Sequence, residues 1–301
     1  MLKSLRNGIS DTIAEMVLRV PSFERPFIHL GPACASRGPL NVFYRRAAKS
    51  LSDRWQRENR QYRTIRIDSY EFIFDATDFT VFNWYFYQQL FEPETTRLIL
   101  GTVKPGETVL DIGSNRGYMS VLAGLKVGAT GRVFCFEPNP IIHGGLQEHL
   151  RLNQIIGHVE ASTLALSNCH SSNVTFFIST LEANSGLSSL TPHPELLANQ
   201  NLCSKNTIAV ETITLDEWLK VKEIDEPIDF IKIDVEGAEM LVLEGAKETL
   251  AKRPPKRWVI ETHPNGPAIE FLRAYGYVTK ILDPAGEHAN LLFTHDTFGI
   301  S

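Results

Sequence analysis

The sequence predicts an α/β fold, with a mostly parallel sheet, helices on both of its faces and a separate N-terminal extension. The first observation is that short apolar runs alternate with helix-like segments from Thr108 onward. Such alternation is typical of parallel strands joined by crossover helices. The second observation is a glycine-containing turn directly after the first apolar run, between Asp111 and Gly117. The third is that residues 1–90 follow a different pattern.

Residues 1–90 are predicted to form a helical and β-hairpin extension, and residues 91–301 an α/β domain. Apolar residues recur every four positions over 41–62, which predicts an amphipathic helix. Alternating apolar residues over 64–76 predict a short hairpin. A helix is expected over 93–100, because proline suits a first helical turn.

The remainder of the chain supplies the sheet and its covering helices. Buried strands are expected at Thr108–Ile112, Arg132–Phe136, Ala161–Leu166, Asp229–Ile233 and Arg257–Ile260. Further strands are expected at Asn173–Ser179, Ile208–Leu215, Tyr277–Ile281 and Leu291–Thr294. Helices are expected at Tyr118–Val127, Ile141–Leu152, Ala238–Ala251 and Ala268–Tyr275. The polar segment Leu181–Asn206 is predicted to be a long loop over the active face.

The composition is that of an ordinary globular protein, with 43% hydrophobic and 22% charged residues in 301. No apolar run reaches the roughly 18 residues that a membrane helix needs, so no transmembrane segment is expected. The N-terminus lacks the features of a signal peptide. The four cysteines form no C-x-x-C pair, which favours reduced thiols and a cytoplasmic location.

The charge is unevenly distributed along the chain. Up to Arg66 there are 13 Lys and Arg against 5 Asp and Glu, whereas the whole chain carries a net charge of -5. A basic segment of this kind could contact a phosphorylated substrate, a membrane surface or nucleic acid. A solvated helix face is the simpler interpretation, because charge blocks alone rarely identify a partner.

Three strand ends predict a nucleoside site. Asp111 ends the first buried strand, and Gly113 and Gly117 bracket the turn into the next helix. The spacing is G-x-x-x-G, whereas dinucleotide sites use G-x-G-x-x-G. Asp111 beside the turn favours a ligand that carries positive charge, such as the amino acid part of S-adenosylmethionine (SAM). Glu137 ends the next strand, where an acid can accept hydrogen bonds from both ribose hydroxyls.

The third strand end, Leu164 to Ser167, offers small and apolar residues for an adenine ring and a hydroxyl for its edge. In the simplest alternative, Asp111 only caps a helix and the glycines are ordinary turn residues. The order of the three elements favours a cofactor site. The cofactor-binding residues expected are Asp111, Gly113, Ser114, Asn115, Gly117, Tyr118, Glu137, Pro138, Asn139, Leu166, Ser167 and Asp234.

An acidic run follows a later strand. Lys232 interrupts the apolar strand, Asp234 ends it, and Glu236 and Glu239 lie just beyond. The next strand ends in Glu261-Thr262-His263. Because parallel strands end at the same edge of a sheet, Glu261 and His263 are expected near Asp234 and Glu236. Gathered carboxylates are costly unless they are paired, protonated or neutralised.

These groups suit acid–base chemistry at a hydroxyl. A hydroxyl is a poor nucleophile until its proton leaves, so a base within hydrogen-bond distance assists transfer. The catalytic residues expected are Lys232, Asp234, Glu236, Glu261 and His263. Glu239 suits the first turn of a helix, and His263 could instead be structural. The same oxygen and nitrogen ligands could hold a metal, but no tight ligand spacing supports one, and none is expected.

These motifs resemble the FkbM-type methyltransferases. The resemblance covers roughly residues 91–263 and rests on Asp111–Gly117, Phe136–Asn139, Ala165–Ser167, Lys232–Glu239 and Ile260–His263. It implies a class I methyltransferase fold, which is Rossmann-like, with a seven-stranded sheet whose last strand is antiparallel. It also implies SAM as cofactor and, usually, O-methylation of a sugar, polyketide or other secondary metabolite. The family usually has Ala-Asn where this chain has Ser114-Asn115.

The leading hypothesis is therefore O-methylation of a small molecule or glycan, with in-line methyl transfer assisted by a carboxylate or histidine base. An N-methyltransferase of a small molecule, an NAD-dependent oxidoreductase and a non-enzymatic binding module are the alternatives. Nucleic acid is not expected as an acceptor, because a phosphate backbone needs a basic track and the catalytic part is acidic. Homo-oligomerisation stays open.

Overall fold

The structure is a computed structural model that describes residues 2–178, 188–191 and 207–298. It divides into two compact units, residues 1–93 and 94–301. The division that we expected from the sequence lies between residues 90 and 91. Most of the predicted loop over 181–206 lies outside the described residues, and only 188–191 of it are described.

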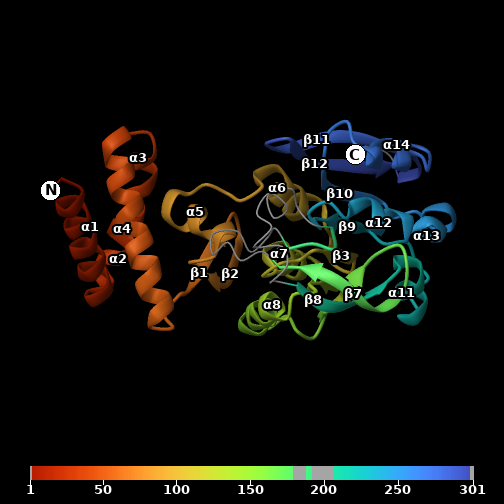
Figure 1. Cartoon of the computed structure of the whole chain (residues 1–301), viewed down its shortest axis with the longest axis horizontal. Coiled ribbons are helices and arrows are strands. Elements are labelled where there is room, and N and C mark those ends of the chain that lie inside the picture. The colour runs from red at the N-terminus through yellow and green to blue at the C-terminus, as the bar shows by residue number, and fades with distance from the viewer. Residues whose placement is uncertain (1, 179–187, 192–206, 299–301) are drawn as a thin grey trace. The chain divides into compact units, whose positions relative to one another are not determined.

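The N-terminal unit is mainly helical, with one β-hairpin (Figure 1). Its elements are α1 (Leu2–Arg19), η1 (Pro21–Phe23), α2 (Glu24–His29), α3 (Gly31–Ala35), α4 (Gly38–Arg57), β1 (Tyr62–Ile67), β2 (Tyr70–Asp75) and α5 (Phe79–Tyr87). The predicted hairpin over 64–76 is present. The predicted helix over 41–62 begins and ends earlier, as α4. It stops because Asn59 has a φ of 53° and Tyr62 already starts β1. Helices α1, α2, α3 and α5 were not predicted.

One ion pair and its contacts join four elements of this unit: β1, α2, α4 and α5. The Arg63 guanidinium donates to both carboxylate oxygens of Glu24, at 2.6 and 3.1 Å, and lies over the Trp55 ring at 4.0 Å. The Tyr85 hydroxyl donates to the same Glu24 at 2.6 Å. Bidentate pairs of this kind fix geometry as well as charge, so part of the basic character of the segment serves the fold of the unit itself.

The C-terminal unit holds the predicted sheet (Figure 1). Its elements are α6 (Pro93–Thr102, in this unit from Glu94), β3 (Thr108–Ile112), α7 (Tyr118–Val127), η2 (Gly128–Thr130), β4 (Arg132–Phe136), α8 (Pro140–Leu152), β5 (Val159–Ser162), β6 (Ala165–Leu166), β7 (Ser171–Phe177), β8 (Thr207–Ile213), α11 (Leu215–Val221), β9 (Phe230–Ile233), α12 (Glu239–Glu244), α13 (Lys247–Lys252), β10 (Arg257–Thr262), α14 (Pro267–Arg273), β11 (Tyr277–Ala285), β12 (His288–His295) and η4 (Asp296–Phe298).

Within the described residues, the main sheet has seven strands in the order β11-β12-β10-β9-β3-β4-β5. Strand β12 pairs antiparallel with both of its neighbours, and the other pairings along the sheet are parallel. The expected fold, with its last strand antiparallel, is therefore confirmed. In the described parts of the chain, none of the helices combines the length and the apolar character that crossing a membrane requires.

The two faces of the sheet differ in character. One face carries a buried apolar core from β3, β9, β10 and β12, on which residues of α11, α12, α13 and α14 pack. On the other face lies α7, whose Ser120 hydroxyl donates to Asp111 of β3 at 2.5 Å. Helices therefore cover both faces, as predicted. Polar groups gather on the α7 side.

Two predicted elements are wrong in detail. The predicted strand Ala161–Leu166 is two strands: β5 belongs to the main sheet, whereas β6 pairs with β8 in a three-stranded sheet, β6-β8-β7. The chain bends between them, and the Leu164 amide donates to the Ser162 hydroxyl at 3.2 Å. The predicted helix Ala238–Ala251 is likewise two helices, α12 and α13, because a cap interrupts it. Helix α11, whose N-terminus Thr214 caps, was not predicted.

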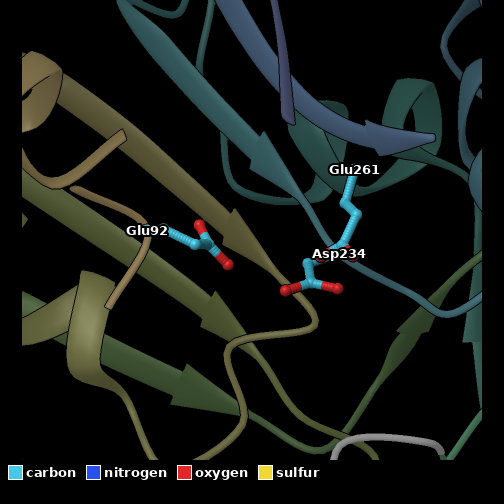
Figure 2. Close-up of side chains that lie close together, drawn as sticks. All are labelled: Glu92, Asp234 and Glu261. Atoms are coloured by element: carbon cyan, nitrogen blue, oxygen red, sulfur yellow. The ribbon is translucent and has the colours of Figure 1, made fainter. Parts of the chain in front are cut away.

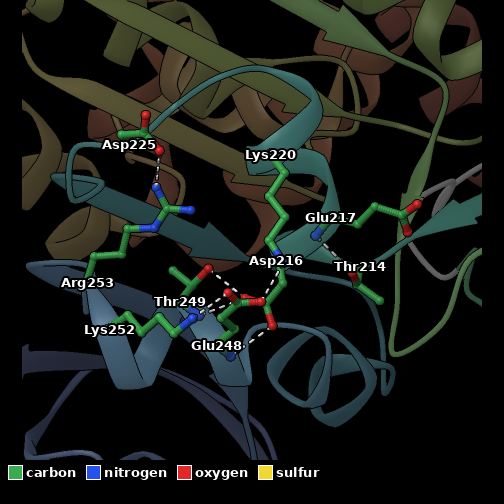
Figure 3. A network of polar contacts seen from close by, with 9 residues as sticks. All are labelled: Thr214, Asp216, Glu217, Lys220, Asp225, Glu248, Thr249, Lys252 and Arg253. Carbon is green, nitrogen blue, oxygen red and sulfur yellow. Dashed lines mark hydrogen bonds and ion pairs between the residues drawn. The ribbon is translucent and has the colours of Figure 1, made fainter.

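The carboxylate of Asp216 provides that cap (Figure 3). It accepts the backbone N–H groups of Glu248 and Thr249, at 2.8 and 2.7 Å, and so starts α13 from a residue of α11. The Asp216 amide donates to the Gly245 carbonyl at 3.0 Å, at the end of α12. The first N–H groups of a helix lack partners inside it, so this long-range cap stabilises the break.

We predict that Asp216→Ala lowers the free energy of unfolding by about 1–2 kcal/mol, because two helix-start N–H groups lose their acceptor. Denaturant unfolding followed by circular dichroism measures the change. Asp225→Ala is the matched control. Its side chain is 95% exposed and pairs with Arg253 at 3.1 Å, and a surface pair contributes at most about 1 kcal/mol. Equal loss in both variants would contradict the capping role.

Candidate active site

The turn after β3 packs against two neighbouring strand ends. Gly113 has a φ of +80°, and a Cβ atom there would lie 1.8 Å from the Asp234 carbonyl oxygen. Gly117 has a φ of +85°, and its Cβ would lie 2.3 Å from Leu146. The Asp234 carbonyl leaves no room for a side chain at Gly113, and the positive φ would strain one at Gly117, so the fold itself favours glycine at both positions. The amides of Gly113 and Ser114 both donate to the Phe136 carbonyl at 3.0 Å.

Glu137 lies directly after β4, as predicted, and is almost fully buried. Its carboxylate accepts the N–H groups of Asn115, at 3.1 Å, and of Asn139, at 2.8 Å. Burial raises the pKa of Glu137 to about 7, and these two hydrogen bonds oppose that rise. Asn139 follows Pro138 and caps α8, where its side chain accepts the Ile141 N–H at 3.1 Å.

A row of charged side chains lies across the buried α7 side of the sheet. Asp111 of β3 is opposite Lys232 of β9, and the Lys232 ammonium donates to Asp234 at 2.8 Å, with only 4% of the lysine side chain exposed. Burial raises the pKa of Asp111, while the charge of Lys232 and the bond from Ser120 oppose that rise. Lys232 therefore compensates charge at the strand end.

Asp234 and Glu261 come together at adjacent strand ends (Figure 2). One carboxylate oxygen of each lies within 4.8 Å of the other. The pairing of Ile233 with Ile260 brings the two positions level. Two carboxylates this close favour a proton, a cation or a hydrogen-bond donor between them. The third residue in Figure 2, Glu92, belongs to the N-terminal unit.

The turn beyond Asp234 is held in a left-handed conformation. Glu236 has a φ of 52° and Gly237 a φ of 93°. The Ser189 hydroxyl donates to the Val235 carbonyl at 2.8 Å, and the Thr191 hydroxyl donates to the Glu236 carbonyl at 3.4 Å. Residues 188–191 of the connection between β7 and β8 are therefore anchored on the acidic strand end.

Glu239 and His263, two further polar residues beyond the strand ends, lie in different turns. Glu239 begins α12 and accepts the Gly237 N–H at 2.7 Å, and burial raises the pKa of its carboxyl. This is the first-turn position that the sequence indicated. His263 is exposed, and its Nδ1 accepts the Asn265 N–H at 3.1 Å in the turn before α14. That contact favours the structural interpretation of His263.

This geometry agrees with the comparison to known proteins. Residues 111–279, which span the glycine turn, the acidic run and β10, match the model of the methyltransferase FkbM domain. The chain belongs to the FkbM methyltransferase family. The methyl donor of this domain is SAM.

Two curated relatives of the FkbM chain are methyltransferases by name. This chain is 30% identical over 154 residues to the 2-O-methyltransferase NoeI of Sinorhizobium fredii, and the match covers 50% of this chain and 61% of that protein. It is 27% identical over 157 residues to the methyltransferase sdnD of Sordaria araneosa, covering 46% and 60%. The matches thus span about three fifths of each relative. A structure of Aeropyrum pernix fibrillarin with bound SAM is more distant, at 16% identity, 66% and 73% coverage and a TM-score of 0.39.

The buried hydroxyl of Ser114, in the glycine turn of the FkbM domain, is available to bond to a ligand. Its side-chain oxygen is buried and has no hydrogen-bond partner among the residues that the structure describes. A buried polar atom without a partner is costly, and SAM carries amino, carboxylate and hydroxyl groups that can satisfy it. The neighbouring Tyr118 begins α7, and its hydroxyl lies 3.3 Å from the Thr96 hydroxyl. The residues of the turn therefore fit the cofactor.

The predicted adenine-binding strand end lies in a different sheet. Leu166 belongs to β6 and to the apolar core. The Ser167 amide donates to the Ile213 carbonyl at 3.0 Å. The Ser167 carbonyl would lie 2.1 Å from a Cβ on Gly245. These contacts fix β6 against β8 and α12, and an adenine contact for Leu166 and Ser167 stays a prediction.

Three residues at the site were missed from the sequence. Ser120 binds Asp111 from α7, and His149, which is buried, makes a 2.7 Å hydrogen bond between its Nδ1 and the Arg116 carbonyl in the glycine turn. Asn290 of β12 is the cross-strand partner of Glu261. Ser120 and Asn290 each interrupt an apolar element, and that interruption was a signal the sequence offered.

We predict that SAH (S-adenosylhomocysteine, the demethylated product of SAM) releases a proton when it binds near pH 7. With a pKa of about 7, Glu137 is partly protonated in the free protein. Hydrogen bonds from the ribose hydroxyls favour the carboxylate and lower its pKa, so binding expels the proton. Calorimetric titrations in two buffers of different ionisation enthalpy should then give different binding enthalpies.

Two variants separate this release from other causes. Glu137→Gln should weaken SAH binding and remove the buffer dependence. Glu248→Gln should retain both, because ion pairs hold the pKa of the exposed Glu248 at about 2 and it carries no proton near pH 7. The assignment of Glu137 to the ribose fails if wild-type enthalpies agree between the buffers.

Proposed function

We propose that this FkbM chain transfers the methyl group of SAM to a hydroxyl of a small molecule, sugar or glycan. The observation that carries the proposal is the contact between Gly113 and the Asp234 main chain. It brings the turn that fits SAM against the strand end that carries the Asp234–Glu261 carboxylate pair. A methyl donor on the turn would then lie beside groups able to hold a hydroxyl.

Several residues of the turn would hold SAM. Glu137 would accept hydrogen bonds from the ribose hydroxyls, since the carboxylate lies after β4 beside the glycine turn. Ser114 would bond to a polar group of the cofactor through its unpartnered oxygen. Asp111 and Asp234 would favour the positive charge of the amino acid part and of the sulfonium. Gly113 and Gly117 would give the cofactor access to the main chain.

The reaction requires a proton acceptor. The acceptor oxygen forms a bond to the methyl carbon as the carbon–sulfur bond breaks, and SAH leaves with the electron pair of that bond. The hydroxyl proton must go to a base, and a base within hydrogen-bond reach typically contributes about 10²–10⁴ in rate. Glu261 is better placed than His263, because Glu261 lies beside Asp234 whereas His263 is exposed in a turn.

Positioning supplies much of the remaining acceleration. Holding nucleophile and methyl carbon in line contributes on the order of 7–11 kcal/mol in favourable cases. Here the contacts of residues 188–191 with Val235 and Glu236 fix the turn beyond Asp234. Lys232, buried and paired with Asp234, fixes the carboxylate from the other side. Oxygen as the methylated atom is further supported by the name of one relative, a 2-O-methyltransferase.

We predict that Glu261→Gln lowers turnover by about 10²–10⁴ and leaves SAH affinity unchanged, because the side chain serves the acceptor. Turnover is measured as SAH formation, with the methylated product identified by mass spectrometry, on a panel of alkyl glycosides, polyhydroxylated metabolites and amines. Glu270→Gln is the control. It removes the same carboxylate charge at an exposed residue of α14 and should behave as wild type.

The product of the wild-type protein decides the proposal itself. Methyl ethers are expected. Methylamines as the products would replace O-methylation by N-methylation, and binding of NAD without binding of SAH would reject methyl transfer. Unchanged turnover in Glu261→Gln would remove Glu261 from the reaction while leaving the activity in place.

A further inference from the structure

Asn290 is a buried amide with no structural explanation. It lies in β12, is 1% exposed, and its Oδ1 has no hydrogen-bond partner among the described residues. A buried amide oxygen without a partner typically costs about 1–3 kcal/mol. The neighbouring β12 residues Leu291 and Phe293 belong to the apolar core on the other face, so an apolar side chain at position 290 would avoid this cost. The oxygen therefore points to a ligand.

The sheet places this oxygen beside the carboxylate pair. Asn290 is directly opposite Glu261 in the antiparallel pairing of β12 with β10. Directly paired residues point to the same face, with their Cβ atoms about 4.5–5.5 Å apart. Glu261 in turn lies level with Asp234, and one oxygen of each lies within 4.8 Å of the other. Three oxygen-bearing side chains thus follow one another across β9, β10 and β12.

Several carboxylates gather around this row. Lys232 provides one buried ammonium, bound to Oδ2 of Asp234. Asp111, Asp234, Glu239 and Glu261 are the carboxylates on or near the same strand ends, and the charge of Asp234 raises the pKa values of both Asp111 and Glu239. Carboxylates gathered at partly buried strand ends favour a cation or a proton between them. One amide oxygen and two carboxylates are hard ligands, which suit a divalent cation.

We propose that Asp234, Glu261 and Asn290 bind a divalent cation of the Mg²⁺ type at this edge of the sheet. Mg²⁺ binds oxygen ligands octahedrally at about 2.1 Å, so two ligand atoms at neighbouring positions lie roughly 3 Å apart and two at opposite positions about 4.2 Å apart. The upper bound of 4.8 Å on the separation of the two carboxylate oxygens is close to the wider of these values. Asp234 can use Oδ1, because Lys232 occupies Oδ2. The sequence offered Asp234, Glu236, Glu261 and His263 as possible metal ligands. The site proposed here keeps Asp234 and Glu261, omits Glu236 and His263, and adds Asn290.

The site leaves coordination positions open. Mg²⁺ usually keeps several waters and is held by one or two carboxylates, so three protein oxygens leave room for a water or a substrate oxygen. A role in methyl transfer rests on the proposed function: a hydroxyl bound to the cation would lose its proton more readily, and the carboxylate oxygen of Glu261 that does not hold the cation would accept that proton. Binding of the cation itself does not depend on that function.

The test uses the metal alone, on the full chain treated with chelator and freed of it. Mn²⁺ serves as the probe, with bound ion counted by electron paramagnetic resonance, and Mg²⁺ is titrated by calorimetry in competition. Wild type should bind one Mn²⁺ per chain that Mg²⁺ displaces. Glu261→Gln and Asn290→Leu should each weaken binding by about tenfold or more. Asn290→Asp should bind at least as tightly as wild type, because it keeps the oxygen and adds charge.

The controls separate loss of the site from loss of the fold. Glu270→Gln removes an exposed acid of α14 and should leave Mn²⁺ binding unchanged. Asn290→Leu should keep or raise the unfolding temperature without metal, because it removes the unpartnered oxygen. No Mn²⁺ bound by wild type at millimolar concentration, or equal binding in wild type and both weakening variants, would overturn the proposal. Methyl transfer that persists in chelator would then leave the O-methyltransferase function standing.

Discussion

The main chain of Gly113 lies against the carbonyl of Asp234 so closely that no side chain fits between them. This contact joins the turn after β3 to the end of β9, the strand that pairs with β3. The Asp234 amide also donates to the Ile112 carbonyl at 2.9 Å, which continues the strand pairing past the last residue of β9. The cofactor turn and the acidic strand end therefore cannot move apart without breaking the sheet. The roles assigned to Glu137 and Glu261 in methyl transfer depend on that fixed distance.

The charged row on the α7 side of the sheet is the second constraint. Asp111 and Lys232 are buried on adjacent strands, and Lys232 pairs with the partly exposed Asp234. Apolar residues would cost less to bury at the first two positions. Ser120 contributes a hydrogen bond, and the charge of Lys232 opposes the desolvation of Asp111. The opposite face of the same strands is wholly apolar and carries the core. The two faces of the sheet thus have different roles. The apolar face packs against α11–α14, and the α7 face carries the buried charged residues.

The sequence was sufficient for features that rest on periodicity and on strand ends. The mostly parallel sheet, the glycine turn, the position of Glu137 and the proximity of Asp234 and Glu261 follow from local patterns in one chain, whereas the seven strands and the antiparallel last strand were implied by the family resemblance. Contacts between distant segments were beyond it. Nothing near residues 238–251 indicates that Asp216 starts a new helix there, and nothing in Ala161–Leu166 shows that its second half pairs with β8. Asn290 became meaningful only when the antiparallel register placed it opposite Glu261.

The three-stranded sheet β6-β8-β7 interrupts the main sheet between β5 and β9 in chain order, and its connection meets the acidic turn through Ser189 and Thr191. The residues that hold the cofactor turn lie before this insertion, except for Asp234. In the described part of the connection, the Ser189 and Thr191 hydroxyls donate to the main-chain carbonyls of Val235 and Glu236, which any residue would present. Because both bonds end on the main chain, exchanging the side chains at positions 235 and 236 would leave the inserted segment attached to the acidic turn.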